Sequence, residues 1–224
     1  MDKLVVYAAT RRLYHNALVC INSALQNGGI DRALLLCEDE TLLYKLPDRV
    51  QIMDVSKQTY FRKYGPNYSK YWTYMTMMRL ALSKLLPDCS RALWLDCDTI
   101  VKHDISELWD LDMTDYYFAA VREPRKSTDS MLYINAGVLM CNLEKLRADG
   151  MDDFLIREVD TRDYDFVDQG CIVRNCQGRI LELPGRYNTS RFTQPDTEIW
   201  IRHYAANKDW IFNDQYKKYK SKEI

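Results

Sequence analysis

The chain has 224 residues, a formal net charge of -1 and 47% hydrophobic residues. This length suits one domain that can bury a sizeable core, and the balanced charge gives no general basis for binding nucleic acid. No apolar run reaches the length of a membrane span, so we expect no transmembrane segment.

Short apolar strands and amphipathic helices alternate through the first part of the chain. We expect strands at Leu4–Ala9, Arg32–Cys37 and 50–55, and helices at Tyr14–Asn27, 41–46 and 71–86. The segment 58–70 is polar and aromatic and predicts a surface loop. Alternation of strand and helix is typical of an α/β protein with a parallel sheet.

The bulky, unbroken apolar run at 92–95 predicts a strand that is buried on both faces. Asp96 and Asp98 follow it, at the strand end where open α/β sheets bind ligands. On an extended chain these two carboxylates point the same way, and their repulsion calls for a cation such as Mn²⁺ or Mg²⁺. Cys97 between them is expected to pack in the core. Two acids alone are also common as ordinary turn residues, so the motif needs support from others.

The remaining elements continue the same pattern. We expect a helical turn at 105–111, strands at 116–121, 179–183 and 199–204, loops at 122–130 and 184–195, an apolar segment at 131–142 that is interrupted at 135–137, and two or more helices within 143–175. The two loops at 58–70 and 184–195 are expected to shape the acceptor site of the activity described below.

The residues 215–224 include four lysines and predict a basic, solvated tail. The seven cysteines are scattered and form no Cys-x-x-Cys pair, which is typical of reduced structural thiols. The first residues also lack the apolar core of a signal peptide. We therefore expect a cytoplasmic protein, with at most a weak peripheral contact of the tail with the cytoplasmic membrane face.

Six short segments, taken together and in this order, resemble glycosyltransferase family 8. They are YAAT at 7–10, LDCDTIV at 95–101, INAGVLMCNL at 134–143, DQG at 168–170, LPGRYN at 183–188 and HYAANKDW at 203–210. This family of retaining nucleotide-sugar transferases includes glycogenin and bacterial lipooligosaccharide galactosyltransferases. The resemblance covers nearly the whole chain. It implies a GT-A fold over residues 1–214, that is, a single Rossmann-like α/β domain with a mixed, mainly parallel sheet flanked by helices, with the tail 215–224 after it.

The resemblance also implies Mn²⁺ or Mg²⁺ as cofactor and a UDP-sugar as donor. The implied metal ligands are Asp96, Asp98 and His203. The implied donor-binding residues are Ala8, Ala9, Thr10 and Tyr14 around the base, Asp96 at the ribose, Arg79 and Lys208 at the phosphates, and Gly137 against the sugar. Thr10-Arg11-Arg12 stands where many relatives have an acid or asparagine, and Ala206 stands where the family often has glycine.

At the reacting centre the resemblance implies Asp168, Gln169 and Asn135. Because glutamine is a poor nucleophile, we favour a front-side mechanism with an oxocarbenium-like transition state over covalent double displacement. Glu123 is a further candidate for contact with the sugar, and Arg122 for reading a carboxylate on donor or acceptor.

The expected function is transfer of a hexose from UDP-glucose, UDP-galactose or a close relative to a glycan, lipid-linked or protein acceptor, with a carbohydrate or glycolipid favoured. One alternative is a nucleotide-sugar-binding protein without transfer activity. Another is a nucleotidyltransferase, but the first strand is not followed by the Gly-rich loop that such enzymes use. The sixteen tyrosines also suggest self-glycosylation, as in glycogenin, as a third alternative.

Overall fold

The structure is a computed structural model that describes residues 2–38, 46–69, 72–124 and 131–220. A seven-stranded sheet with the order β3-β2-β1-β4-β7-β6-β8 forms its centre. The strands are β1 Leu4–Ala9, β2 Arg32–Cys37, β3 Val50–Asp54, β4 Arg91–Leu95, β6 Phe118–Arg122, β7 Ile134–Asn142 and β8 Ile180–Leu183. Only β7 runs antiparallel to its neighbours in this sheet, β4 and β6. The sheet is therefore mixed and mainly parallel, as the sequence predicts.

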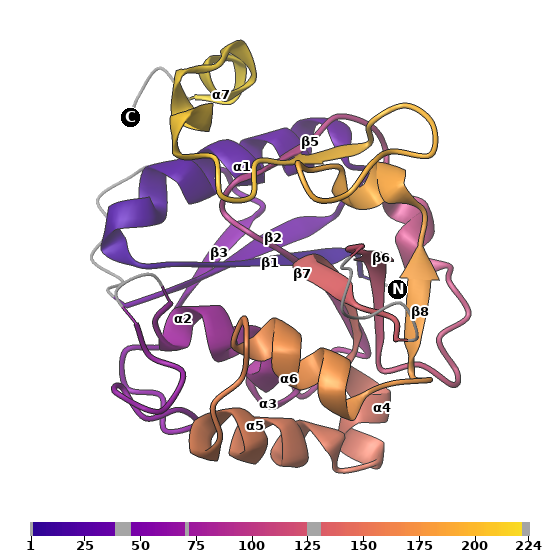
Figure 1. Cartoon of the computed structure of the whole chain (residues 1–224). Helices are drawn as coiled ribbons and strands as arrows, with labels where there is room; N and C mark the ends of the chain where they lie inside the picture. Colours follow the sequence, from indigo (N-terminus) through magenta and orange to yellow (C-terminus); the bar gives the residue numbers. More distant parts are fainter. Residues whose placement is uncertain (1, 39–45, 70–71, 125–130, 221–224) are drawn as a thin grey trace.

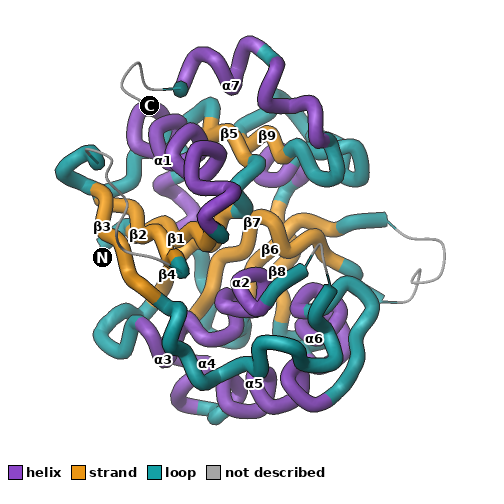
Figure 2. Tube along the Cα trace, turned by 90° about the vertical axis from the view of Figure 1, so that its left-hand side faces the viewer, coloured by secondary structure: helices purple, strands orange, loops and turns teal. Residues whose placement is uncertain are grey.

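Helices cover both faces of this sheet (Figure 1). One face carries α1, Tyr14–Asn27, together with a two-stranded ribbon of β5, Thr99–Val101, and β9, Ile201–His203. The helices α2 to α6 lie on the other face, and Figure 2 shows the same layers from the side. Their bounds are α2 Tyr74–Met77, α3 Leu82–Leu85, α4 Leu143–Ala148, α5 Met151–Thr161 and α6 Asp168–Asn175.

Alternation along the central strands divides the apolar side chains between the two layers. In β4, Ala92 and Trp94 join the core beneath α2–α6, whereas Leu93 and Leu95 join the core beneath α1. None of these four side chains is more than 2% exposed. Successive strand residues point to opposite faces, so an unbroken apolar run fills both cores. This burial confirms the predicted two-sided strand before the acids.

The expected helix at 71–86 is instead broken into three pieces. A 3₁₀ turn, Met78–Ala81, separates α2 from α3. Thr73 caps α2 by accepting a hydrogen bond from the backbone N–H of Met75 at 3.3 Å. Within the tighter turn, the buried Arg79 donates from Nε to the carbonyl of Thr76 at 3.1 Å. The segment is thus helical over most of its length, as its periodicity predicts, with the buried Arg79 in the tighter turn.

Two further expectations need correction in part. The strand β7 continues through 135–137, but its pairing with β6 is interrupted there, because Ala120 pairs with Leu139 and the next residue, Val121, pairs with Asn135, so that residues 136–138 of β7 are skipped. The solvated tail is a wrong prediction up to residue 219, because α7, Asp214–Tyr219, packs on α1 with Tyr216 and Tyr219 buried. Asn27 of α1 donates to the Tyr219 hydroxyl at 2.7 Å. Most of the helix expected at 41–46 lies outside the described residues.

No helix among the described residues has both the length and the apolar character needed to cross a bilayer. The longest of them, α1, has 14 residues.

Arg147 of α4 provides a test of how the helical layer is held together. Its guanidinium donates to the carbonyls of Ser83 at 3.1 Å, Leu86 at 3.3 Å and Cys89 at 2.7 Å, where α3 ends. We expect Arg147→Ala to lower the free energy of unfolding by about 2 kcal/mol, because charged donors contribute more than neutral ones. Urea denaturation measures this, with the exposed Arg174→Ala as control, which should shift it by less than about 0.5 kcal/mol. Equal effects of the two variants would contradict the role of Arg147.

Candidate active site

The two acids after β4 lie on a turn rather than on an extended chain. The backbone N–H of Thr99 donates to the carbonyl of Asp96 at 3.2 Å, and the Thr99 hydroxyl donates to the same oxygen at 2.8 Å. The expectation that an extended chain points both carboxylates the same way is therefore wrong. The turn, rather than strand alternation, brings them together. Cys97, between them, turns to the other side, as predicted, and its thiol donates to the carbonyl of Ala8 at 3.2 Å.

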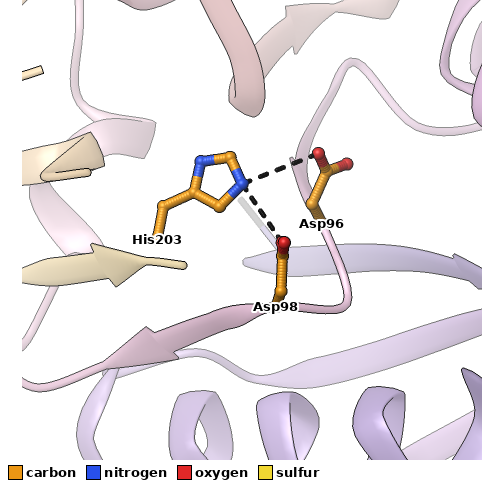
Figure 3. Close-up of side chains that lie close together, drawn as sticks. All are labelled: Asp96, Asp98 and His203. Atoms are coloured by element: carbon orange, nitrogen blue, oxygen red, sulfur yellow. Dashed lines mark ion pairs between the residues drawn. The ribbon is translucent and has the colours of Figure 1, made fainter. Parts of the chain in front are cut away.

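His203 meets both acids from the ribbon strand β9 (Figure 3). Its Nε2 lies 3.1 Å from Oδ1 of Asp98 and 3.9 Å from Oδ2 of Asp96. The ribbon pairs Thr99 with His203, which sets the histidine directly beside the acidic turn. The three side chains offer ligand atoms that all lie within 4.8 Å of one another. The structure thus brings together the three predicted metal ligands.

The chemistry of this group fits a divalent cation. Burial alone lowers the pKa of His203, but the carboxylates of Asp98 and Asp96 outweigh that effect and raise the pKa above its usual value. A positive charge is therefore stabilised between the acids, and a metal ion would replace the proton there. Two carboxylates and an imidazole form a donor set that suits Mn²⁺ and, less well, Mg²⁺.

A chain of side chains fixes the orientation of the histidine ring. Glu123 accepts from Nδ2 of Asn135 at 2.7 Å, and Oδ1 of Asn135 accepts from Nδ2 of Asn188 at 2.9 Å. Oδ1 of Asn188 is then the acceptor for Nδ1 of His203, at 2.9 Å. Because every amide in this chain has only one consistent orientation, Nδ1 carries the hydrogen and Nε2 faces the acids.

Asn188 is the functional residue that sequence reasoning missed. It lies in the LPGRYN segment but received no role, although its side chain is fully buried beside the histidine. Nothing in the spacing of Asn188 and His203 indicates their contact, because a loop of irregular structure separates the 3₁₀ turn Gly185–Asn188 from β9. The only indication in the sequence is that Asn188 belongs to the LPGRYN segment, which resembles the family.

Arg79 is 4% exposed and holds two of the acids. Its Nη2 lies 3.0 Å from Oδ1 of Asp96, and its Nε lies 2.9 Å from Oδ2 of Asp168. The guanidinium also donates to the carbonyl of Ala136 and stacks on Trp94, with Cζ 4.7 Å from the ring centroid. Trp94 donates to Oδ1 of Asp96 at 2.9 Å as well. These bonds occupy Oδ1 of Asp96 and leave its Oδ2 toward His203.

Asp168 begins α6 and is 2% exposed. The cap position belongs to Val167, so Asp168 is the first residue of the helix itself. Burial raises the pKa of Asp168 to about 6, against the opposing charge of Arg79. Its Oδ2 forms an ion pair with Arg79 but accepts no hydrogen bond from the described residues. That oxygen is itself buried, so its charge is balanced within the protein by Arg79.

The side chain of Gln169 is held on both sides. Its Oε1 accepts from the backbone N–H of Ala136 at 3.0 Å, and its Nε2 donates to the hydroxyl of Tyr133 at 3.2 Å. A neutral amide held in this way can line a reacting centre, but it offers no activated nucleophile.

One cavity of about 750 Å³ collects most of these residues. Its lining includes Arg79, Asp96, Asp98, Glu123, Asn135, Gly137, Asp168, Gln169 and His203. Four carboxylates thus face one permanently charged cation, Arg79, among the described residues of the lining. Such an excess of negative charge repels an anionic ligand unless a cation is bound with it.

A second cavity of about 590 Å³ shares His203, Ala205 and Ala206 with the first. Arg191 and Arg202 line it. Ala206, where the family often has glycine, has a φ of 58°, in the left-handed region that favours glycine. Lys208 begins a 3₁₀ turn, Lys208–Phe212, but its side chain lies outside the described atoms.

The expected base-binding residues do not line the large cavity. Ala8 and Ala9 end β1, and the hydrogen bond from Cys97 joins that strand end to the acidic turn. Thr10 is half-buried, whereas the ring of Tyr14 is only 2% exposed and packs in the core beneath α1. The ring of Tyr14 thus presents little surface on which a base could stack.

Arg122 is not placed to read a substrate carboxylate in the cavity. Its guanidinium makes two hydrogen bonds with Glu182 of β8, at 2.8 and 2.7 Å, on the exposed side of β6. Its neighbour Glu123 does line the cavity, as the sequence suggested.

Comparison with known sequences finds a match of residues 5–211 to the family model described as Glycosyl transferase family 8. A putative glycosyltransferase of Haemophilus influenzae is 29% identical over 172 residues, which cover 65% of this chain and 51% of the relative. General stress protein A of Bacillus subtilis is 27% identical over 191 residues, which cover 77% of this chain and 65% of the relative. The chain thus spans about half to two thirds of the length of these curated relatives.

Among solved structures, the galactosyltransferase LgtC in complex with donor and acceptor sugar analogs is similar with a TM-score of 0.73 at 19% identity. The match covers 96% of this chain and 93% of that one. The bifunctional glycosyltransferase WbbM is similar with a TM-score of 0.76 at 15% identity, over 99% of this chain and 50% of that one. These likenesses show the fold, which is the GT-A fold that the sequence predicts.

Gly137 provides a test of the metal site. A Cβ atom on this residue would lie 2.1 Å from Cε1 of His203. We expect Gly137→Ala to displace the imidazole and to weaken Mn²⁺ binding at least about tenfold, as misplacement of one ligand does. Calorimetric titration with Mn²⁺ measures this. The control is Gly65→Ala, whose Cβ would meet its nearest atom at 3.4 Å and which should bind Mn²⁺ like the wild type. Wild-type affinity in Gly137→Ala would contradict the site.

Asn188→Ala tests the orientation of the histidine. Removing the amide frees both the tautomer and the rotation of His203, so we expect Mn²⁺ affinity to fall about 10- to 100-fold. Electron paramagnetic resonance of free Mn²⁺ gives the affinity. Asn22→Ala, which removes an amide that contacts the carbonyl of Tyr219 on the far side of α1, is the control and should leave the affinity unchanged. A fall of the same size in both variants would argue against a specific role of Asn188.

Proposed function

Because this chain belongs to glycosyl transferase family 8, we propose that it is a metal-dependent, retaining glycosyltransferase that uses a UDP-sugar. The donors we propose are UDP-glucose and UDP-galactose, and the acceptor is a glycan, a lipid-linked sugar or a protein, with a carbohydrate or glycolipid favoured. The observation that carries the proposal is the excess of carboxylates in the cavity, with Asp96, Asp98 and His203 gathered at one point.

The charge balance explains why a metal ion belongs to this activity. A diphosphate would enter a cavity that already holds four carboxylates and a single arginine. A divalent cation on Asp96, Asp98 and His203 makes that point attractive to phosphate oxygens. Bound there, the ion would act as a Lewis acid that stabilises charge on the leaving diphosphate. We propose Mn²⁺, or Mg²⁺, as that ion.

The remaining polar groups are assigned by their contacts. The carboxyl of Asp168 lines the cavity and would accept a hydrogen bond from a hydroxyl of the donor sugar. Gln169 and Asn135 are held in single orientations beside it, at Ala136 and Asn188. Gln169 is a neutral amide and a poor nucleophile, which supports front-side transfer with retention over a covalent intermediate at this residue. Gly137 leaves room at the acidic turn.

Further residues are proposed for the phosphates and the base of the donor. We propose that Arg79 and Lys208 supply positive charge near the phosphates. Ala8, Ala9, Thr10 and Tyr14 remain the proposed base pocket, because the end of β1 adjoins the acidic turn through Cys97. The burial of Tyr14 gives Thr10 the larger share of that contact.

We also propose a cytoplasmic location. Cys141, Cys171 and Cys176 are free thiols, and burial raises the pKa of each to about 12. Thiols of this kind pack as apolar side chains and suit a reducing compartment.

UDP release tests the proposed activity directly. Wild-type protein is incubated with UDP-glucose, UDP-galactose and other UDP-sugars, with Mn²⁺ or with EDTA. We expect slow hydrolysis of one donor that EDTA abolishes and that Asp98→Asn lowers about 100-fold or more, since each lost factor of ten corresponds to 1.36 kcal/mol of barrier. The exposed Asp88→Asn is the matched control and should retain the wild-type rate.

The same assay separates the alternatives. A rise of the protein's melting temperature with UDP and Mn²⁺, without release of UDP from any donor, would indicate a nucleotide-sugar-binding protein. If the protein shows no binding of UDP with Mn²⁺ and no release of UDP from any donor, the proposed function is contradicted. A mass increase of the protein itself by a hexose would indicate self-glycosylation.

A further inference from the structure

Three exposed aromatic side chains from three separate segments meet at the large cavity. Trp72 precedes α2, Phe166 precedes α6, and Phe192 lies in the loop after the 3₁₀ turn at 185–188. They are 41%, 42% and 43% exposed. Eight large hydrophobic side chains are exposed among the described residues, and three of them line this one cavity. Scattered apolar side chains are normal on a surface, whereas a cluster at a cavity indicates binding.

The rings of Trp72 and Phe166 stand edge to face. Their centroids lie 6.2 Å apart at an angle of 65°. This spacing is that of a stabilising aromatic pair, so each ring holds the other in place while a face of each remains open to solvent. Arg191 lies against Phe192 with its Cζ 5.3 Å from the ring centroid. The rim of the cavity is therefore aromatic and positioned before any ligand arrives.

The backbone under Phe166 is strained. Phe166 has a φ of 59°, and Val167 has φ 55° and ψ -117°, a conformation that glycine adopts readily and a β-branched residue rarely. Such conformations are held only where the surrounding structure fixes them. The turn is tight, since a Cβ on Gly170 would lie 2.0 Å from the carbonyl oxygen of Asp165. This turn leaves the ring of Phe166 exposed and buries Asp168, two residues later. Burial of apolar surface alone would not favour a turn that exposes an aromatic ring.

The aromatic rim stands over a polar floor. Asp168, Gln169, Asn135 and Glu123 line the same cavity. A ligand that satisfies both must have an apolar face and a polar edge. An alkyl chain would cover the rings but would offer no hydrogen bonds to the polar side chains of the floor, while excluding water from them. A pyranose ring has C–H groups on its face and hydroxyls on its edge, and so fits both.

We propose that Trp72 and Phe166, together with Phe192, form a platform on which a pyranose ring of the acceptor stacks. This inference rests on the proposed function, in which the metal ligands hold the donor diphosphate and Asp168 its sugar. The exposed rings at the rim then remain for the second substrate. The acceptor class is thereby narrowed to molecules with a terminal sugar, rather than a bare lipid or peptide.

The experiment measures binding of small glycosides to the protein. The probes are methyl α- and β-glycosides of glucose and galactose, with lactose and maltose, and hexanol represents an alkyl ligand. Saturation-transfer NMR is recorded with UDP and Mg²⁺, which is diamagnetic, and also without nucleotide. The rate of UDP release, measured as a function of glycoside concentration, gives the KM of any glycoside that accelerates turnover.

We expect the wild type to bind at least one glycoside and not hexanol. Trp72→Ala and Phe166→Ala should each weaken that binding about tenfold, which corresponds to 1.4 kcal/mol, and raise the glycoside KM with little change in kcat. Phe166→Tyr and Trp72→Phe, which keep a ring, should remain within threefold of the wild type. Phe212→Ala removes a 70% exposed ring that lines neither cavity and should have no effect.

Several results would overturn the platform. These are binding of no glycoside by the wild type, unchanged binding in both alanine variants, or hexanol binding that depends on the same rings. The proposed function is judged separately by UDP and Mn²⁺ binding and by donor hydrolysis, which the ring variants should leave unchanged. Loss of glycoside binding together with loss of UDP binding in these variants would also overturn the inference, because the rings would then serve the donor.

Discussion

The site depends on the pairing of one buried arginine with two carboxylates. Arg79 lies 3.0 Å from Asp96 and 2.9 Å from Asp168, and it is 4% exposed. The cost of burying these charges is offset only because all three are present. Burial opposes the charge of Arg79, but the two acids outweigh it and raise the pKa of the guanidinium. The pair also fixes which oxygen of Asp96 remains toward His203. The other polar groups of the cavity, among the described residues, lie around this network of ion pairs.

Arg79 balances only part of the negative charge, and the remainder gives the cavity its chemical character. Asp98 and Glu123 line it as well. Asn135 is the hydrogen-bond partner of Glu123, and His203 is the partner of Asp98. A cation is the simplest way to complete this balance, and a diphosphate bound with that cation then becomes an attractive rather than a repelled ligand. The excess of acid is thus a reason for metal dependence in its own right, separate from the likeness to any relative.

Backbone geometry positions these groups, since several of them come from rigid strands. The antiparallel strand β7 places Gly137 beside the acidic turn, where the N–H of Asp96 donates to its carbonyl at 2.9 Å. The ribbon of β5 and β9 delivers His203, and α1 holds that ribbon through Ser23 and Asn27, which bond the N–H and the carbonyl of Val101 at 3.0 and 2.8 Å. Sites on rigid elements keep the geometry that catalysis requires. The strained turn at Phe166 is the exception, and it lies where a second substrate would enter.

The sequence by itself determined most of the secondary structure and the chemical character of the site. The strands Leu4–Ala9 and Arg32–Cys37 and the helix Tyr14–Asn27 follow from hydrophobic periodicity, which is a local property. Only the tertiary structure decided that the acids lie on a turn, that Arg79 pairs with two of them, that Asn188 orients His203, and that α7 packs on α1. The turn at the acids is local, since Thr99 bonds to Asp96, and the apolar run before it does not show where the strand ends. The other contacts join residues more distant in the chain, and their free energy comes from burial and pairing that no local pattern encodes.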